Sequence, residues 1–362
     1  MKLGTFMMPL HPPGRQPWET LAEDREAILL ADRLGYCEAF VGEHVTDLAE
    51  NVTSCLMFLA SVAHETKAIV LGSGTVNMPN SHPATIAAQV AMLDHILRGR
   101  FIMGISPGGL MSDAEVFGNY KKDRNEIFLE SINMVLAIWA GAAPYDLTGK
   151  YFSVTTGQTM IPEIGQGTII KPYQSPHPPI VVTAVAPHSK GVTAAAARGW
   201  RPISANFLLP EWVATHWPRY VEGRHSVGAA PTPAEWRIAK SIFVADDAAT
   251  AKRYGHGPEG PYHFYFKQLV RKLVGFGGRS NLFKLDQSEP DDKITADSVT
   301  ERLVIAGTVD SVVDQLLAFR ATTGDFGTLL YACHDWVDPT LGKRSMQLMA
   351  EQVMPRLNAA LK

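Results

Sequence analysis

The sequence predicts an α/β fold, specifically a (β/α)8 barrel with insertions. Short β-branched runs alternate with longer segments of helical periodicity, the pattern of a parallel sheet covered by helices. Seven or eight such strand–helix units follow one another without a linker or a low-complexity tract. A chain of 362 residues exceeds one average domain but suits one barrel, so we expect a single domain over 1–362. A doubly wound sheet is the alternative, and it would be unusually long.

The first part of the chain supplies four of these units. Apolar, β-branched runs predict strands at 3–8, 38–41, 68–71 and 101–105. Apolar residues at helical spacing predict helices at 19–34, 56–64 and 125–139. A further helix opens at His82-Pro83, with proline in the first turn, where its missing N–H costs nothing, and ends at Gly99.

The alternation resumes in the second half. Strands are predicted at 180–183, 202–205, 237–245, 303–305 and 328–331. Helices are predicted at 193–197, 211–220, 311–319 and 341–357. Together with the first part, these segments give the seven or eight strand–helix units that favour a barrel.

Two stretches interrupt the pattern. Residues 140–179 are rich in Gly, Pro and Thr and read as an irregular excursion, with a short strand at 151–154. Residues 255–300 lack a regular period, and long loops inside compact domains are commonly lids or binding loops. We therefore expect an active-site lid at 255–300. Its aromatic residues would either shield the site or pack on the barrel without touching substrate; they are Tyr262, Phe264, Tyr265 and Phe266.

Composition excludes several classes of function. Lys and Arg number 33 against 36 Asp and Glu, and a net charge of −3 gives no reason to expect a nucleic acid or an anionic membrane as partner. Three scattered cysteines cannot build a disulfide framework, which favours the reducing cytoplasm. No secretory signal is expected, because Met1-Lys2 leads directly into a strand-like stretch, and no apolar run in the sequence approaches about 20 residues. Because only 19% of residues are charged, some neutral surface is expected to be covered by a second subunit, and the family resemblance described below specifies this as a homodimer.

Polar and glycine-rich clusters follow several predicted strands, where parallel barrels carry their functional groups. Taken singly, glycines after strands are usually turn residues. No dinucleotide fingerprint or P-loop is present. The scattered histidines, with Glu43 and Asp335, lack metal-ligand spacing, so no metal is expected. Ser189-Lys190-Gly191 is more informative, because a hydroxyl, a cation and free N–H groups at a helix start suit a phosphate; the alternative is a simple capping serine.

Taken together, the clusters resemble the bacterial luciferase-like flavin monooxygenases along nearly the whole chain. The resemblance rests on four segments in order: Gly42-Glu43-His44; Met78-Pro79-x-x-His82-Pro83 continuing through Leu93-Asp94 to Gly99-Arg100-Phe101-x-x-Gly104-Ile105; Asp113-x-x-x-Phe117-Gly118 with Glu130 to Trp139; and Thr183 to Ser189 with Gly199. The stretches 183–204 and 324–339 look most like the diketocamphane-type Baeyer–Villiger members. Residues 6–13 and 34–36 resemble limonene monooxygenase-like members.

The resemblance implies a function and a set of site residues. It implies a two-component monooxygenase that uses FMNH2 from a separate flavin reductase and O2, by way of a flavin C4a-peroxide. It also implies a nonprolyl cis peptide against the flavin at Gly74-Thr75, and His44 as the flavin-proximal catalytic residue. The remaining matching positions are cofactor-binding ones: Ser106 beside the flavin, Arg124 and Ser189 at the phosphate, and Thr183, Ala184 and Lys190 in the phosphate turn.

One departure from the family concerns the phosphate site. Luciferases carry cysteine and then arginine where this chain has Ser106 and Pro107, so a bidentate phosphate contact is lost. Lys190 or Arg124 would have to compensate. The change to Ser106 argues against light emission.

The substrate and two rival functions stay open at this point. Aromatic and apolar residues without a catalytic carboxylate cluster suggest a small hydrophobic substrate, such as a cyclic ketone or terpenoid. Related barrels use the deazaflavin F420 for hydride transfer, which is the first alternative. A non-catalytic flavin-binding subunit is the second, and retention of His44 and Asp113 weighs against it.

Overall fold

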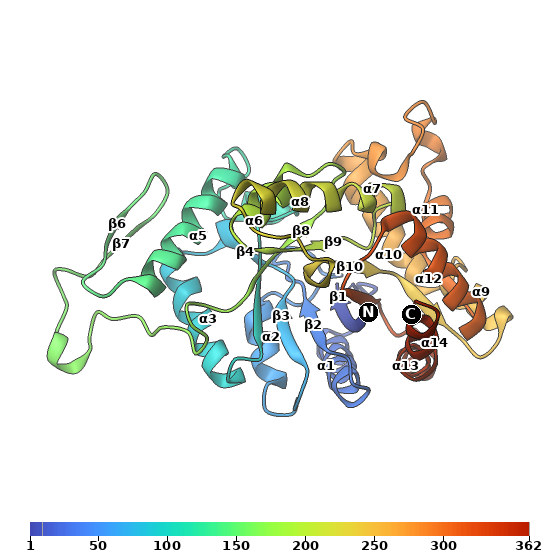
Figure 1. Cartoon of the computed structure of the whole chain (residues 1–362), viewed down its shortest axis with the longest axis horizontal. Helices are drawn as coiled ribbons and strands as arrows, with labels where there is room; N and C mark the ends of the chain where they lie inside the picture. Colours follow the sequence, from blue (N-terminus) through green and yellow to red (C-terminus); the bar gives the residue numbers. More distant parts are fainter. Residues whose placement is uncertain (9, 362) are drawn as a thin grey trace. The chain divides into compact units, whose positions relative to one another are not determined.

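The computed structural model describes residues 1–8 and 10–361, and its helices and strands alternate as the sequence predicts (Figure 1). The fold class, a (β/α)8 barrel with insertions, is confirmed. The chain divides into two compact units, Met1–Ala39 with Val182–Lys362, and Phe40–Val181. Each unit is described separately below. That the chain forms a single domain stays a prediction.

The first unit is built on parallel strands in the order β1, β13, β10, β9, β8. Their bounds are β1 (Lys2–Met7), β8 (Ile180–Ala184, which enters the unit at Val182), β9 (Arg201–Ser204), β10 (Arg237–Lys240) and β13 (Thr328–Cys333). Its helices are α1 (Pro17–Arg33), α6 (Lys190–Ala197), α7 (Pro210–Ala214), α8 (His216–Ser226), α9 (Ala248–Gly255), α10 (Pro261–Val270), α11 (Ala296–Leu303), α12 (Val309–Thr323), α13 (Pro339–Leu348) and α14 (Met354–Ala360). A separate parallel pair joins β11 (Ile242–Val244) to β12 (Ile305–Gly307).

The second unit contains the parallel strands β3 (Val70–Ser73), β4 (Val76–Asn77) and β5 (Phe101–Ser106), with β5 between the other two. β2 (Glu38–Val41) enters this unit at Phe40. Its helices are α2 (Cys55–Val62), α3 (Pro83–Leu97), α4 (Met111–Val116) and α5 (Arg124–Ala140). The predicted excursion contains an antiparallel hairpin of β6 (Asp146–Thr148) and β7 (Ser153–Thr155).

The two faces of the first unit's strands are chemically distinct. Tyr331 reaches Ser345 of α13, and the Lys240 ammonium lies over Phe319 of α12, so these side chains point toward the helices. Alternate residues point the other way. A Cβ on Gly4 would come within 2.7 Å of the Leu330 side chain, which places both residues on the face averted from the helices. There Glu38 accepts two hydrogen bonds from the Arg237 guanidinium, at 2.6 and 2.9 Å, so this buried charge is paired.

Close packing in the second unit fixes the ends of β3 and β5. A Cβ on Gly104 would lie 1.9 Å from the Ser73 carbonyl oxygen, so only glycine fits there. The Ser73 hydroxyl donates to the Gly104 carbonyl and accepts from the Gly104 N–H. This contact holds the chain in place just before Gly74.

Three details of the predicted elements are wrong. Residues 255–300 are more helical than expected, because Pro261 starts α10 and its residues Tyr262, Tyr265 and Phe266 bury one face at helical spacing. The strand expected at 303–305 begins later, at Ile305, because α11 starts at a capping box formed by Thr295 and Ser298 and its helical turns continue through Leu303. The run 237–245 forms two strands, since β11 pairs with β12 and not in the main sheet. The lid assignment itself stays a prediction.

Membrane insertion was not expected from the sequence. Within residues 1–8 and 10–361, no helix combines the length and the apolar character needed to cross a bilayer.

Lys240 costs stability because its amine is buried between β10 and α12. Burial lowers the pKa of Lys240 to about 7, against partial opposition from Glu211. Below pH 7 the lysine is charged in both the folded and the unfolded chain, so the full burial penalty is present; above pH 10.5 it disappears. We expect Lys240→Met to raise the free energy of unfolding by up to about 5 kcal/mol at pH 6.5, because the pKa of the lysine falls from 10.5 to about 7 on folding. Urea unfolding should show a smaller increase in the free energy of unfolding of Lys240→Met at pH 10. The control Lys121→Met, at an exposed lysine, should show no increase at either pH.

Candidate functional site

His44 lies just after β2 and is held between two buried carboxylates. Its Nδ1 lies 2.9 Å from Asp113 Oδ2, and its Nε2 lies 3.3 Å from Glu50 Oε2. Asp113 also accepts hydrogen bonds from the backbone N–H groups of Val45 and Thr46 and from the Thr46 hydroxyl. Burial raises the pKa of Asp113, but the bonds from His44 and Thr46 outweigh it and leave that pKa below its ordinary value. Asp113 is therefore an ionised group that orients the His44 ring.

The peptide bond between Gly74 and Thr75 is cis, as predicted. It joins β3 to β4 and is buried, with Thr75 7% exposed. The Gly74 N–H donates to the Val41 carbonyl at the end of β2. The bond therefore lies at the C-terminal edge of these strands, where parallel barrels build their sites.

A chain of hydrogen bonds joins the loops that follow β2, β4 and β5. The Glu43 carboxylate accepts from the N–H groups of Cys55 and Asn77, and the Asn77 amide donates to the Glu43 carbonyl. The Ser106 hydroxyl donates to Asn77 Oδ1 at 2.9 Å and accepts from the Gly108 N–H. The second unit thus brings together Ser106, the Gly74–Thr75 turn and the loop that carries His44.

Arg124 lies beside the same loops. It is the first residue of α5, and its Nη1 donates to the Gly108 carbonyl at 2.8 Å. Its Nη2 contacts Met111 Sδ at 3.4 Å. The guanidinium is half-buried, and these two contacts are to an uncharged carbonyl and a sulfur, neither of which neutralises its charge.

The first unit carries the remaining predicted residues at the end of β8 and the start of α6. Thr183 and Ala184 end the strand, and the Ala184 carbonyl accepts from the Ala205 N–H. Ser189 precedes α6 as its N-cap residue, and in the described part of the chain its hydroxyl caps no N–H of that helix. Lys190 is exposed. A serine hydroxyl, a cation and the first N–H groups of a helix form a donor set suited to phosphate.

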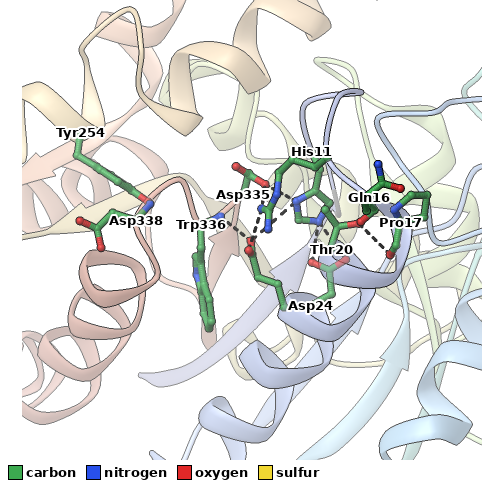
Figure 2. A network of polar contacts seen from close by, with 11 residues as sticks. His11, Gln16, Pro17, Thr20, Asp24, Tyr254, Asp335, Trp336 and Asp338 are labelled. Carbon is green, nitrogen blue, oxygen red and sulfur yellow. Dashed lines mark hydrogen bonds and ion pairs between the residues drawn. The ribbon is translucent and has the colours of Figure 1, made fainter.

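The sequence analysis missed a buried charge cluster in the first unit (Figure 2). His11, in the loop after β1, lies 2.5 Å from Asp335 through Nδ1 and 3.1 Å from Asp24 through Nε2. Arg15 bridges Asp335 and Glu23 at 2.5 and 2.8 Å. Burial lowers the pKa of His11, but the bonds to Asp24 and Asp335 outweigh it and raise that pKa to about 9.

The same cluster could be mistaken for a metal site. His11, Glu23 and Asp335 each offer one potential metal-ligand atom, and these three atoms lie within 4.8 Å of one another. However, a metal needs a deprotonated imidazole, and here His11 is protonated while Arg15 already bonds to two of the carboxylates. The cluster is therefore an ion network that ties α1 to the loops after β1 and β13. Asp335 was named from the sequence but could not be paired there with His11, because the two residues lie 324 positions apart.

Comparison with known proteins gives consistent relatives. A model of the luciferase-like monooxygenase family matches residues 1–325. The 4-hydroxyprotoasukamycin monooxygenase of Streptomyces nodosus subsp. asukaensis is 29% identical, over 100% of this chain and 93% of its own. The limonene 1,2-monooxygenase of Rhodococcus erythropolis is 27% identical, over 99% and 87%.

A solved structure is also similar over nearly the whole chain. It is a type II Baeyer–Villiger monooxygenase, the oxygenating constituent of 3,6-diketocamphane monooxygenase from the CAM plasmid of Pseudomonas putida, in complex with FMN. It has a TM-score of 0.87 and 26% identity and covers 98% of each chain. The predicted likeness to diketocamphane and limonene monooxygenases is confirmed.

Proposed function

The chain belongs to the luciferase-like monooxygenase family, and on that premise we propose that it inserts one oxygen atom from O2 into a small hydrophobic carbonyl compound, a cyclic ketone or terpenoid, with reduced FMN from a separate flavin reductase. The orientation of His44 by Asp113 carries this proposal. A buried, ionised carboxylate aligned on one imidazole nitrogen, in the same unit as the cis peptide bond Gly74–Thr75, is an arrangement typical of catalytic sites.

The residues present fit FMN. Ser189 and Lys190 in the first unit, and Arg124 in the second, offer hydroxyl and cationic donors of the kind that a phosphate requires. Ser106 and Asn77 offer hydroxyl and amide groups suited to the polar edge of a flavin ring. When bound, reduced FMN supplies the electrons that activate O2.

His44 is the proposed catalytic residue. Its Nδ1 proton is held by Asp113, which leaves Nε2 as the nitrogen that gives or takes a proton. Glu50, 3.3 Å from Nε2, is the next acceptor along that path. The His44 side chain is 16% exposed, so water has little access to the proton that it moves.

Isotope incorporation tests the proposal. The purified chain is combined with FMN, NADH, a flavin reductase from another source, ¹⁸O2 and a panel of cyclic ketones and terpenoids. We expect one ¹⁸O atom in the product, measured by mass spectrometry, and only when reductase is present. Equilibrium dialysis with FMN and F420 runs in parallel. Tighter F420 binding with oxygen-independent alcohol oxidation would favour the hydride-transfer alternative, and an absence of labelled product would favour a non-catalytic subunit. A homodimer and a cytoplasmic location stay predictions.

A further inference from the structure

His334, which directly follows β13, ends a chain of hydrogen-bonded polar side chains in the first unit. His334 follows Cys333, the last residue of β13, and its ring packs against Tyr262 and Tyr265 of α10. Ser241 follows Lys240, the last residue of β10. Both residues stand at the C-terminal ends of parallel strands, the end at which barrel enzymes bind their substrates.

The hydrogen bonds of this chain run in one direction. The Tyr265 hydroxyl donates to Asn206 Oδ1, and Asn206 Nδ2 donates to the Ser241 hydroxyl, each at 3.0 Å. Ser241 is fully buried, and its hydroxyl lies 3.0 Å from His334 Nε2. Among residues 1–8 and 10–361 the Ser241 hydroxyl has no acceptor other than Nε2 of His334, so it accepts from Asn206 and donates its own proton to Nε2. The proton of the neutral His334 ring is therefore on Nδ1.

The His334 ring is neutral and held in place. Burial lowers the pKa of His334 to about 3, with partial opposition from Asp335, so the ring stays unprotonated at neutral pH. The rings of Tyr262 and Tyr265, both on α10, lie 4.6 and 4.4 Å from it between centroids. The imidazole therefore has one fixed tautomer and one fixed orientation.

Nδ1 of His334 is a buried donor without an acceptor. Among residues 1–8 and 10–361, no protein atom accepts a hydrogen bond from it. Leaving such a donor unsatisfied is costly, so a buried N–H group of this kind is expected to bind a ligand or a water.

We propose that the Nδ1–H group of His334 binds the carbonyl oxygen of the substrate. This inference rests on the proposed function and narrows its substrate class to ketones and aldehydes. A carbonyl oxygen accepts from a neutral N–H donor, and it gains negative charge when a nucleophile adds to the carbonyl carbon, so a fixed donor binds it more tightly as the reaction proceeds. Ser241 and Asn206 act as positioning residues, because they fix which nitrogen carries the proton.

Binding of two ligands of similar shape to the full chain without FMN tests this role. Cyclohexanone has a carbonyl oxygen, and methylenecyclohexane has a CH2 group in its place. We expect His334→Leu to weaken cyclohexanone binding about 10-fold in calorimetry and to leave methylenecyclohexane binding unchanged. His334→Asn keeps an amide donor near the Nδ1 position and should retain most of the cyclohexanone affinity. In turnover, His334→Leu should lower kcat more than it raises KM.

A spectroscopic measurement on the unaltered protein covers the case in which His334→Leu fails to fold. With ¹⁵N-labelled histidine, the Nδ1–H resonance of His334 should shift on addition of cyclohexanone and not on addition of methylenecyclohexane. A shift with FMN alone, or equal losses of affinity for both ligands, would overturn the role of His334. If the ¹⁸O assay succeeds with cyclohexanone while this resonance stays fixed, the inference is wrong and the oxygenase function stands. If the protein neither binds nor oxygenates any ketone, both fall.

Discussion

Replacing His44 by leucine is expected to lower the rate of ¹⁸O incorporation at least 100-fold at pH 7.5, because a positioned general acid–base contributes about 10² to 10⁴ in rate. The substitution removes the imidazole whose Nδ1 proton Asp113 holds and whose Nε2, beside Glu50, is the nitrogen proposed to exchange a proton. The measurement is labelled product formed per FMNH2 consumed, which separates loss of coupling from loss of flavin binding.

Asp113→Asn is the matched variant. It keeps the size of the side chain but removes the charge that orients the His44 ring. We expect its rate of ¹⁸O incorporation to lie between that of His44→Leu and that of the unaltered enzyme. Because the pKa of Asp113 lies below its ordinary value, this carboxyl is ionised at any assay pH from 5 to 9, and its titration should not shape the pH profile there. His64→Leu, at an exposed histidine, is the control. Equal activity of His44→Leu and His64→Leu would remove His44 from the mechanism.

Elements with strong local signals could be predicted from the sequence. The strand at 38–41 is found at its predicted bounds, because it is a short apolar run closed by glycine. The helix opening at His82-Pro83 starts where proline demands. The helix at 261–270 was not predicted, because the glycine-rich sequence around it obscured the proline at its start. In the structure this helix is stabilised by the packing of Tyr262, Tyr265 and Phe266.

The candidate site shows the same difference between features with a local sequence signal and features that depend on tertiary contacts. Motifs with a fixed local spacing, such as Gly42-Glu43-His44 and Gly74-Thr75, could be located from the sequence. Contacts between distant segments could not: His11 meets Asp335, 324 residues away, and Ser241 meets His334, 93 residues away. In the sequence, each of these residues looks like an ordinary polar side chain. The residues of each pair meet only because the strands that precede them lie side by side in the sheet.

The His11 cluster should make stability depend on pH. The folded-state pKa of His11 is about 9, above the ordinary value of 6.5, so its contribution to stability is fully present below pH 6.5 and is lost as the pH rises through 9. This change amounts to about 3 kcal/mol in the free energy of unfolding. The carboxylates of Asp24, Asp335 and Glu23 lie next to the His11 ring. Arg15 acts on the ring indirectly, because it forms ion pairs with Glu23 and Asp335.

Substituting His11 by leucine is expected to lower the free energy of unfolding by about 3–5 kcal/mol at pH 6.5, because Asp24 and Asp335 stay buried after losing their shared cation. Urea unfolding at pH 6, 7, 8, 9 and 10 measures the effect. The gap between the unaltered chain and His11→Leu should be widest at pH 6 and narrow steadily to pH 10, where His11 is neutral in both states of the unaltered chain. Arg15 remains in the variant and still pairs Glu23 with Asp335, so the protein should keep its fold at pH 6. A gap that stays constant across this range would mean that His11 is held as a neutral ring, and the ion network would then be wrong.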